Sequence, residues 1–193
     1  MDVKALLIGG YDEPLRGVVI TEAARNMAAL SPGSSLLIIR DHYEEIAGTE
    51  SLGIKVDVEQ LSGGCYCCSM KHDFELLLIE KGRKGDIRNL IVEVPLTADL
   101  ETVKDSITDI MGDGIQVTTI FAIDLLSAGV MMETFPELMN RSLKASDMLA
   151  ISHDIKGGIN KLATLGSEWR EFRDLNNVGH AFDSGCGYII LSK

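Results

Sequence analysis

The chain has 193 residues, a formal net charge of −11 at pH 7 and only 5% aromatic residues. This length is sufficient to bury a hydrophobic core as one domain. The acidity argues against nucleic acid and anionic membranes as main partners, because both are bound by basic surfaces. The sequence has no apolar run of about 18 residues and no signal-peptide pattern at its start, so we expect a cytoplasmic protein with reduced cysteines.

Short apolar runs rich in Val, Ile and Leu alternate with segments of helical character along the chain. Most of the runs are continuous, which favours central strands covered on both faces. We therefore predict a three-layer α/β fold, with a mostly parallel sheet of about six or seven strands and helices on both faces. In chain order the predicted elements are a strand at 3–10, a helix at 18–30, strands at 34–40 and 54–61, a helix at 72–84, a strand at 89–94, a helix at 99–111, a strand at 117–124, helices at 125–132 and 134–145, a strand at 147–152, a helix at 159–174 and a strand at 187–192.

Three of the four cysteines lie in the segment LSGGCYCCSMKHD, as Cys65, Cys67 and Cys68. Thiolates are soft ligands that favour zinc and similar ions, and the two preceding glycines permit a tight turn around an ion. Three sulfurs leave a four-coordinate site one ligand short. Two alternatives stay open: buried free cysteines, and a redox dithiol formed by Cys65 and Cys68 at the C-x-x-C spacing. The remaining cysteine, Cys186, is either a remote ligand or a core residue.

The segment GGCYCCSMKHDFELLLIE resembles the G-x-C-x-C-C motif and following helix of the CobW/HypB/UreG family of P-loop GTPases, in its CobW-like branch. Other stretches resemble the same family in the right order: LLIIRDHYEEIAG resembles its second strand and switch-one region, and NLIVEVPLTADLETV, VTTIFAID and KASDMLAISHDIK resemble its later strands. The resemblance covers residues 1 to about 156 and implies a single P-loop NTPase-like domain, 1–193, without the family's separate C-terminal domain.

In that family the cysteine motif binds a transition metal, and members deliver metal or help to insert cofactors with the use of GTP. The resemblance implies that Cys65, Cys67 and Cys68 are metal ligands here, with Glu45 and His42 of the switch-one region as further ligands. Thiolates with a carboxylate and an imidazole suit zinc, and also nickel or cobalt. Taken without the cysteines, the stretch RDHYEE is more simply a solvated polar loop.

The nucleotide site departs from the family pattern G-x-x-x-x-G-K-[ST]. In that pattern backbone N–H groups cradle phosphate, the lysine contacts the β and γ phosphates, and the hydroxyl holds Mg²⁺. The best register here is GYDEPLRG, in which Gly10 fits, Arg16 replaces the lysine and Gly17 lacks the hydroxyl. The positions between them also differ, because Asp12 and Glu13 add negative charge, Pro14 removes an N–H donor and Leu15 replaces the second glycine.

Two later positions agree with this reading. Pro95 stands where the resemblance places the γ-phosphate-sensing glycine, and Asp154 is one residue out of register with the guanine-reading carboxylate, while Glu93 is kept. We therefore expect no ordinary GTP hydrolysis and interpret Gly10, Arg16, Gly17, Glu93 and Asp154 as a vestigial nucleotide site. Binding of a different phosphate ligand, through Arg16 and the start of the helix that follows, stays open.

The leading hypothesis is a transition-metal-binding accessory protein, of metallochaperone or cofactor-assembly type, with a thiolate site and a GTPase site that no longer works. Its expected partners are a metal-receiving client protein or a competent homologous subunit, or a second copy in a homodimer, with no nucleic acid and no membrane. One alternative is an active GTP- or ATP-binding hydrolase with a variant P-loop. The other is a structural assembly partner without metal, whose contact surface would be residues 125–145.

Overall fold

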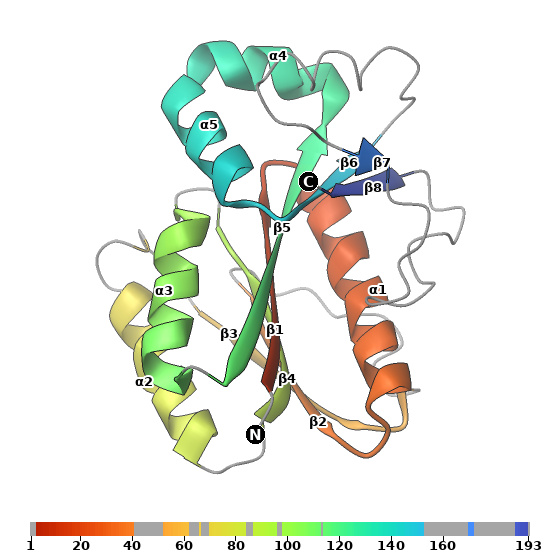
Figure 1. The fold of residues 1–193 in the computed structure, drawn as a ribbon, viewed down its shortest axis with the longest axis vertical. Helices are drawn as coiled ribbons and strands as arrows, with labels where there is room; N and C mark the ends of the chain where they lie inside the picture. Colours follow the sequence, from red (N-terminus) through yellow and green to blue (C-terminus); the bar gives the residue numbers. More distant parts are fainter. Residues whose placement is uncertain are drawn as a thin grey trace.

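The protein, in a computed structural model, forms a twisted β-sheet with helices packed on both faces (Figure 1). The structure describes residues 3–40, 52–61, 66, 70–83, 87–95, 98–112, 114–152, 170–171 and 188–192. Its elements are β1 (Val3–Gly10), α1 (Glu13–Leu30), β2 (Ser35–Arg40), β3 (Lys55–Gln60), α2 (Lys71–Arg83), β4 (Ile87–Glu93), α3 (Leu100–Met111), β5 (Ile115–Asp124), α4 (Leu125–Thr134), α5 (Pro136–Ala145), β6 (Met148–Ser152), β7 (Arg170–Glu171) and β8 (Tyr188–Ser192).

The strand order within the described residues is β3-β2-β4-β1-β5-β6-β8-β7. The strands from β3 to β6 in this order are all parallel, β8 is antiparallel to β6, and β7 is antiparallel to β8. The predicted α/β class with a mostly parallel sheet is therefore confirmed. The predicted strands recur within a few residues of their expected bounds, because long continuous apolar runs mark buried strands clearly.

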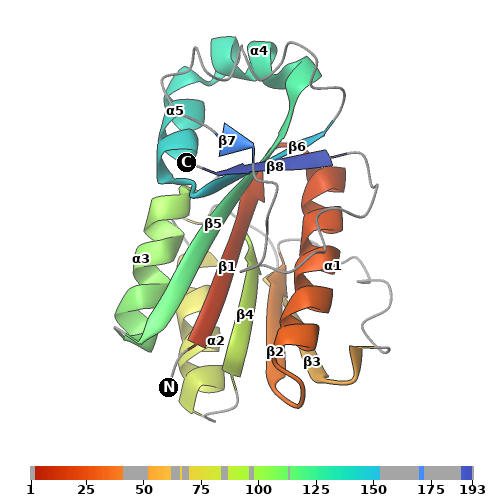
Figure 2. The ribbon, with the colours of Figure 1, turned by 45° about the vertical axis from the view of Figure 1, so that its right-hand side comes forward.

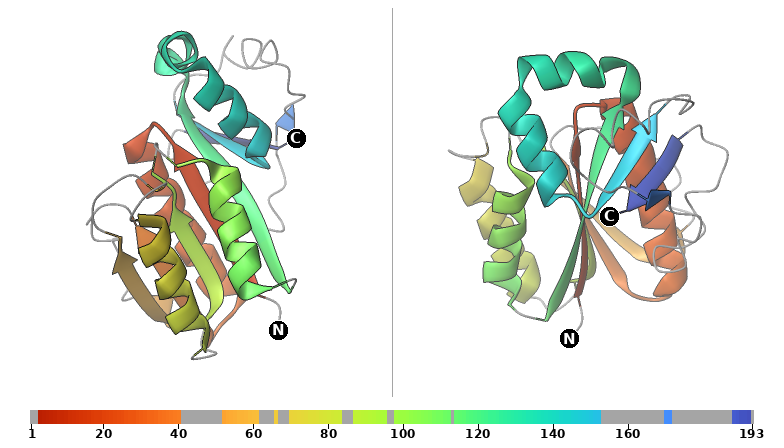
Figure 3. Two further views of the ribbon diagram at one scale, coloured as in Figure 1. Left: turned by 90° about the vertical axis from the view of Figure 1, so that its left-hand side faces the viewer. Right: turned by 45° about the horizontal axis from the view of Figure 1, so that its top comes forward.

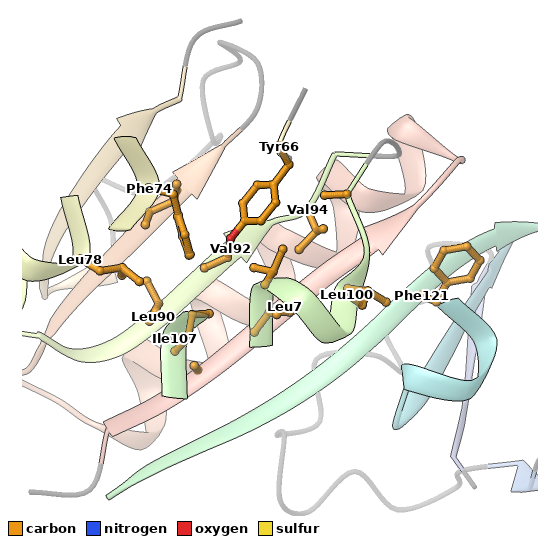
Figure 4. Close-up of a cluster of buried hydrophobic side chains, with 14 of the residues drawn as sticks. Leu7, Tyr66, Phe74, Leu78, Leu90, Val92, Val94, Leu100, Ile107 and Phe121 are labelled. Carbon is orange, nitrogen blue, oxygen red and sulfur yellow. The ribbon is translucent and has the colours of Figure 1, made fainter. Parts of the chain in front are cut away.

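Alternate residues of the strands divide the core into two layers (Figure 2, Figure 3). On one face, Leu6 and Ile8 of β1 pack with Val19 and Ile20 of α1, and all four are buried. On the other face, α2 and α3 cover the sheet, and α5 extends this layer. Figure 4 shows that cluster, in which the largest fully buried side chains are Leu7, Ile39, Phe74, Leu78, Leu90, Leu100 and Ile107. Burying each such side chain contributes about 1.5–3 kcal/mol.

Helix α1 begins at Glu13, earlier than the predicted start near residue 18. Asp12 is its N-cap, and the Asp12 side chain accepts a hydrogen bond from the Leu15 N–H at 3.0 Å. Pro14 lies in the first turn, where its missing N–H and fixed φ cost nothing. An acidic N-cap followed by a proline is therefore the signal that marks this start in the sequence.

The predicted helix at 159–174 is wrong where the structure can test it. Arg170 and Glu171 form β7, which pairs antiparallel with β8 through Arg170↔Ser192 and Glu171↔Leu191. The backbone edge of β8 satisfies their polar groups, and such a long-range pairing leaves no local pattern in the sequence. The rest of that range lies outside the described residues.

Among the helices that the structure describes, none combines the length and the apolar character needed to cross a membrane.

Candidate functional site

The carboxyl ends of β2 and β4 meet the first turns of α1 at a buried ion-pair triad. The carboxylate of Glu93, the last residue of β4, accepts from Arg16 Nε at 3.1 Å through Oε1 and from Arg40 Nε at 2.9 Å through Oε2. The side chains of Arg16, Glu93 and Arg40 are only 6%, 0% and 3% exposed. Each carboxylate oxygen thus serves one guanidinium group in a site without direct solvent access.

Arg16 points back into the fold. Besides its bond to Glu93, its NH1 group donates to the carbonyl oxygen of Gly10 at 2.5 Å. The structure therefore brings together three of the predicted nucleotide residues, Gly10, Arg16 and Glu93. It does so in an arrangement where the residue at the lysine position binds the protein's own carboxylate and carbonyl. Gly17 follows inside α1, where its carbonyl accepts from Thr21 Oγ1 at 2.9 Å.

The connection between β1 and α1 is short. Only Tyr11 and Asp12 separate the two elements, so α1 begins at Glu13, within the four residues that the P-loop pattern places between Gly10 and position 15. The Asp12 carboxylate lies at the helix N-terminus, the position at which a helix would otherwise attract a phosphate. The start of α1 thus carries an internal anion.

Packing against β5 requires a glycine at position 10. Its φ is +124°, and a Cβ at this position would lie 2.0 Å from the carbonyl oxygen of Ala122 on the neighbouring strand β5. Any side chain would collide with that backbone. The glycine therefore does not by itself indicate a phosphate loop.

Tyr11 fixes the same connection from the other side. Its hydroxyl donates to the carbonyl oxygen of Asp124 at 2.7 Å, and its ring meets the Phe121 ring edge-on with centroids 6.3 Å apart. Burial raises the pKa of Tyr11 well above its ordinary value. Asp124 in turn accepts from the N–H and the hydroxyl of Ser127 in α4. The turn after β1 is thereby held against the end of β5.

The predicted metal ligands Cys65, Cys67, Cys68, Glu45 and His42 lie outside the described residues, as does Asp154. Within the part of the chain that the structure describes, no group of three or more His, Cys, Asp or Glu side chains could hold a metal ion. The metal site therefore stays a prediction from the sequence.

Tyr66, the residue between Cys65 and Cys67, is described and is 3% exposed. Its ring lies 5.9 Å from the Phe74 ring of α2, and Figure 4 shows it directed into the cluster with Val92 and Val94. Burial raises the pKa of Tyr66 to about 12, with Ser106 near enough to moderate the rise. Among the described residues, the Tyr66 hydroxyl nevertheless has no hydrogen-bond partner of normal geometry.

Tyr66 and the triad share one small cavity. Its wall includes Arg40 and Glu93 from the triad. Tyr66 and Met70, which both belong to the segment LSGGCYCCSMKHD, also line it, as does Pro95. Tyr66, the residue between two of the cysteines, thus lines the same cavity as Glu93 and Arg40. Sequence reasoning missed both Arg40 and Tyr66. Arg40 could have been noticed as a charge that ends a continuous apolar strand.

No family model matches the chain, and no curated protein matches its sequence. Among solved structures it is similar to the signal recognition particle receptor FtsY from Elizabethkingia anophelis in complex with GDP, with a TM-score of 0.50 and 12% identity over 82% of this chain and 52% of that chain. It also aligns with FtsY from Mycoplasma mycoides, at a TM-score of 0.42 and 12% identity over 86% of this chain and 67% of that one. A third alignment is with HypB from Helicobacter pylori in complex with nickel, at a TM-score of 0.42 and 12% identity over 94% and 73%.

These likenesses concern the fold. The chain has the P-loop NTPase-like α/β fold that the resemblance implied, with a parallel sheet flanked by helices. It spans about half the length of the first FtsY chain, 52%.

Proposed function

We propose that the protein is a transition-metal-binding accessory protein, of metallochaperone or cofactor-assembly type, and a CobW-like variant of the P-loop GTPase fold that does not hydrolyse GTP. The observation that carries the proposal is the buried Arg16–Glu93–Arg40 triad, which lies beside Tyr66 of the thiol segment. The proposed ligands are Cys65, Cys67 and Cys68 with Glu45 and His42. Zinc is the expected ion, and nickel and cobalt suit the same donors.

The triad supports the loss of nucleotide hydrolysis. Arg16 is only 6% exposed and already donates to Glu93 and the Gly10 carbonyl, so a phosphate would have to compete with these partners. Breaking a buried ion pair costs on the order of 3–5 kcal/mol when a charge is left without its partner. The Asp12 carboxylate at the start of α1 would also repel an incoming phosphate. A nucleotide in the usual pose would therefore have to overcome two costs before it gains any contact.

The burial of Tyr66 supports the proposal that Cys65 and Cys67 bind a metal ion. A buried aromatic side chain between two cysteines gives the thiol segment a fixed attachment to the core. Such an attachment reduces the conformational entropy lost when several thiolates gather around one ion. Glu93 is not among the proposed ligands, because both of its oxygens accept from arginines.

Without hydrolysis, we propose that metal leaves by ligand exchange with a client protein, or after contact with a competent homologous subunit. Thiolate ligands permit such exchange, because an incoming thiolate can replace them one at a time.

The test is metal affinity measured by competition with a chromophoric chelator, on protein purified without chelators. We expect tight binding of Zn²⁺, with weaker or comparable binding of Ni²⁺ or Co²⁺, and loss of that binding in Cys65→Ser and Cys67→Ser. Cys186→Ser is the matched control and should bind as the wild type does. If wild-type protein takes up no metal and its Cys65–Cys68 thiols instead form a reversible disulfide, the redox alternative replaces the proposal.

A further inference from the structure

A second cavity lies at the amino-terminal end of the parallel sheet, opposite the carboxyl ends that carry the triad. Its volume is about 450 Å³, within the range of about 300–1,000 Å³ typical of small-molecule sites. Its wall combines the start of β1, neighbouring residues of β4 and β5, the first residue of β6 and the carboxyl-terminal half of α1. Residues from distant parts of the chain thus form one concave site.

The cavity follows from unequal strand lengths. β5 begins at Ile115, but β6 joins it only at Ile120↔Met148, so the first residues of β5 extend past β6. Figure 2 shows this amino-terminal part of β5 running beyond β6. Just before β6 begins, the Asp147 carboxylate accepts a hydrogen bond from the Thr119 N–H of β5 at 2.9 Å. The cavity lies between α1 and the part of β5 that precedes its pairing with β6.

Its lining has one charge and one unpaired donor. Lys4 is the one ionisable side chain among the described residues of the wall. Asn26 of α1 also lines the cavity, and its Nδ2 group is buried without a hydrogen-bond partner in the described structure. A buried donor without an acceptor is costly, so it favours a ligand that supplies one.

Beside Lys4 and Asn26, the wall has six apolar residues and four polar ones, which are Ser31, Asn89, Gln116 and Thr118. Leu6, Met27 and Met148 line it, and methionine side chains adapt readily to ligands of different shape. A cation and an amide donor beside such a wall suit a molecule with one anionic acceptor group and an apolar body.

We propose that this cavity binds a small amphipathic monocarboxylate. The carboxylate accepts from the Lys4 ammonium and the Asn26 amide, and the apolar body packs against Met27 and Met148. This site is separate from the thiol segment and goes beyond the proposed metal function, so neither proposal depends on the other.

The probe is octanoate, titrated into the full chain by calorimetry, with octanol and octylammonium as matched ligands. We expect one saturable octanoate site, weaker binding of octanol and no binding of octylammonium. Lys4→Gln and Asn26→Asp should each weaken octanoate binding by about ten-fold or more, as expected for loss of one charge-assisted hydrogen bond. Arg88→Gln removes an exposed cation of β4 outside the cavity wall, and should leave the affinity unchanged.

Absence of saturable octanoate binding at millimolar concentration would overturn the proposal. Equal binding of octanoate and octanol would overturn it too, as would equal effects of Lys4→Gln and Arg88→Gln. Melting curves of each variant establish that it is folded. Lys4 is exposed, so Lys4→Gln keeps the test decisive even if Asn26→Asp impairs folding.

Discussion

At the residue scale, Glu93 holds together the two arginines of the buried triad. Its carboxylate is fully buried, and each oxygen is committed to a different arginine. A carboxylate that holds two guanidinium groups joins the ends of β2 and β4 to α1, so it serves the fold.

The change Glu93→Gln tests this structural role. It removes the charge that both arginines need while nearly keeping the shape, so we expect a loss of about 3–5 kcal/mol in the free energy of unfolding. Urea denaturation measures the loss. The control is Glu133→Gln, an exposed carboxylate of α4, which should change stability by less than about 0.5 kcal/mol. Similar losses in the two variants would contradict a buried triad.

Tyr66 makes a prediction about alkaline pH. Its folded pKa of about 12 lies above the ordinary value of 10.0, so folding favours the neutral phenol. The resulting stability is fully present below pH 10 and is lost as the pH rises towards about 12. Tyr66→Phe removes this titration and, because the buried hydroxyl lacks a hydrogen bond, should be as stable as wild type at neutral pH or slightly more so.

Melting temperatures measured from neutral pH to strongly alkaline pH test this expectation. The wild type should lose more stability than Tyr66→Phe over the alkaline part of the range. Equal losses, or a marked destabilisation of Tyr66→Phe at neutral pH, would show that the hydroxyl has a partner or is solvated.

The sequence identified Arg16 and Glu93 as members of one site but did not reveal that they bind each other. They are 77 positions apart in the chain, and a motif comparison assigns each a separate role toward a nucleotide. The charge of Arg40 at the end of an apolar strand was overlooked, and its partner Glu93 is 53 positions away, so no local pattern indicates the pair. Tyr66 was missed because only the neighbouring thiols were considered for chemistry.

At the scale of the elements, each residue of the turn from β1 to α1 has a contact within the protein. Asp12 caps the helix, Tyr11 binds the end of β5, and Gly10 allows β1 to approach Ala122. These three residues therefore stabilise the protein's own structure. The strands were predictable because continuous apolar runs report burial. The early start of α1 and the pairing of β7 depend on a cap and on a distant strand, which periodicity does not report.

Gly10→Ala tests whether packing alone requires the glycine. The added Cβ would meet backbone atoms of β5 at 2.0 Å, and φ is +124°, so we expect a loss of several kcal/mol or failure to fold. Gly33→Ala is the matched control, since its φ is +79° but its Cβ would meet nothing within 4 Å. That variant should lose only about 1 kcal/mol. Unfolding midpoints, or soluble yield where Gly10→Ala does not fold, compare the two, and equal stability would contradict the close approach of β1 to β5.

At the scale of the whole molecule, the P-loop NTPase-like fold carries the buried triad, and the proposed cysteine ligands lie close to Tyr66 in the sequence. The structure describes Gly10, Arg16 and Glu93, and Arg16 donates to both of the others. The proposed metal ligands Cys65 and Cys67 flank Tyr66 in the sequence, and Tyr66 lines the same cavity as Glu93 and Arg40 of the triad. A protein of this kind would hold a metal ion on a scaffold whose nucleotide response is replaced by a fixed internal network.

The most direct test is a single preparation in which bound metal and nucleotide are both quantified, after incubation with Zn²⁺ and Mg²⁺–GTP followed by removal of free ligand. We predict about one zinc ion per chain, as for one tetrahedral thiolate site, with no retained nucleotide and no change in zinc content when GTP is omitted. Retained guanine nucleotide that is lost in Arg16→Ala, or a chain free of zinc, would contradict the proposed function.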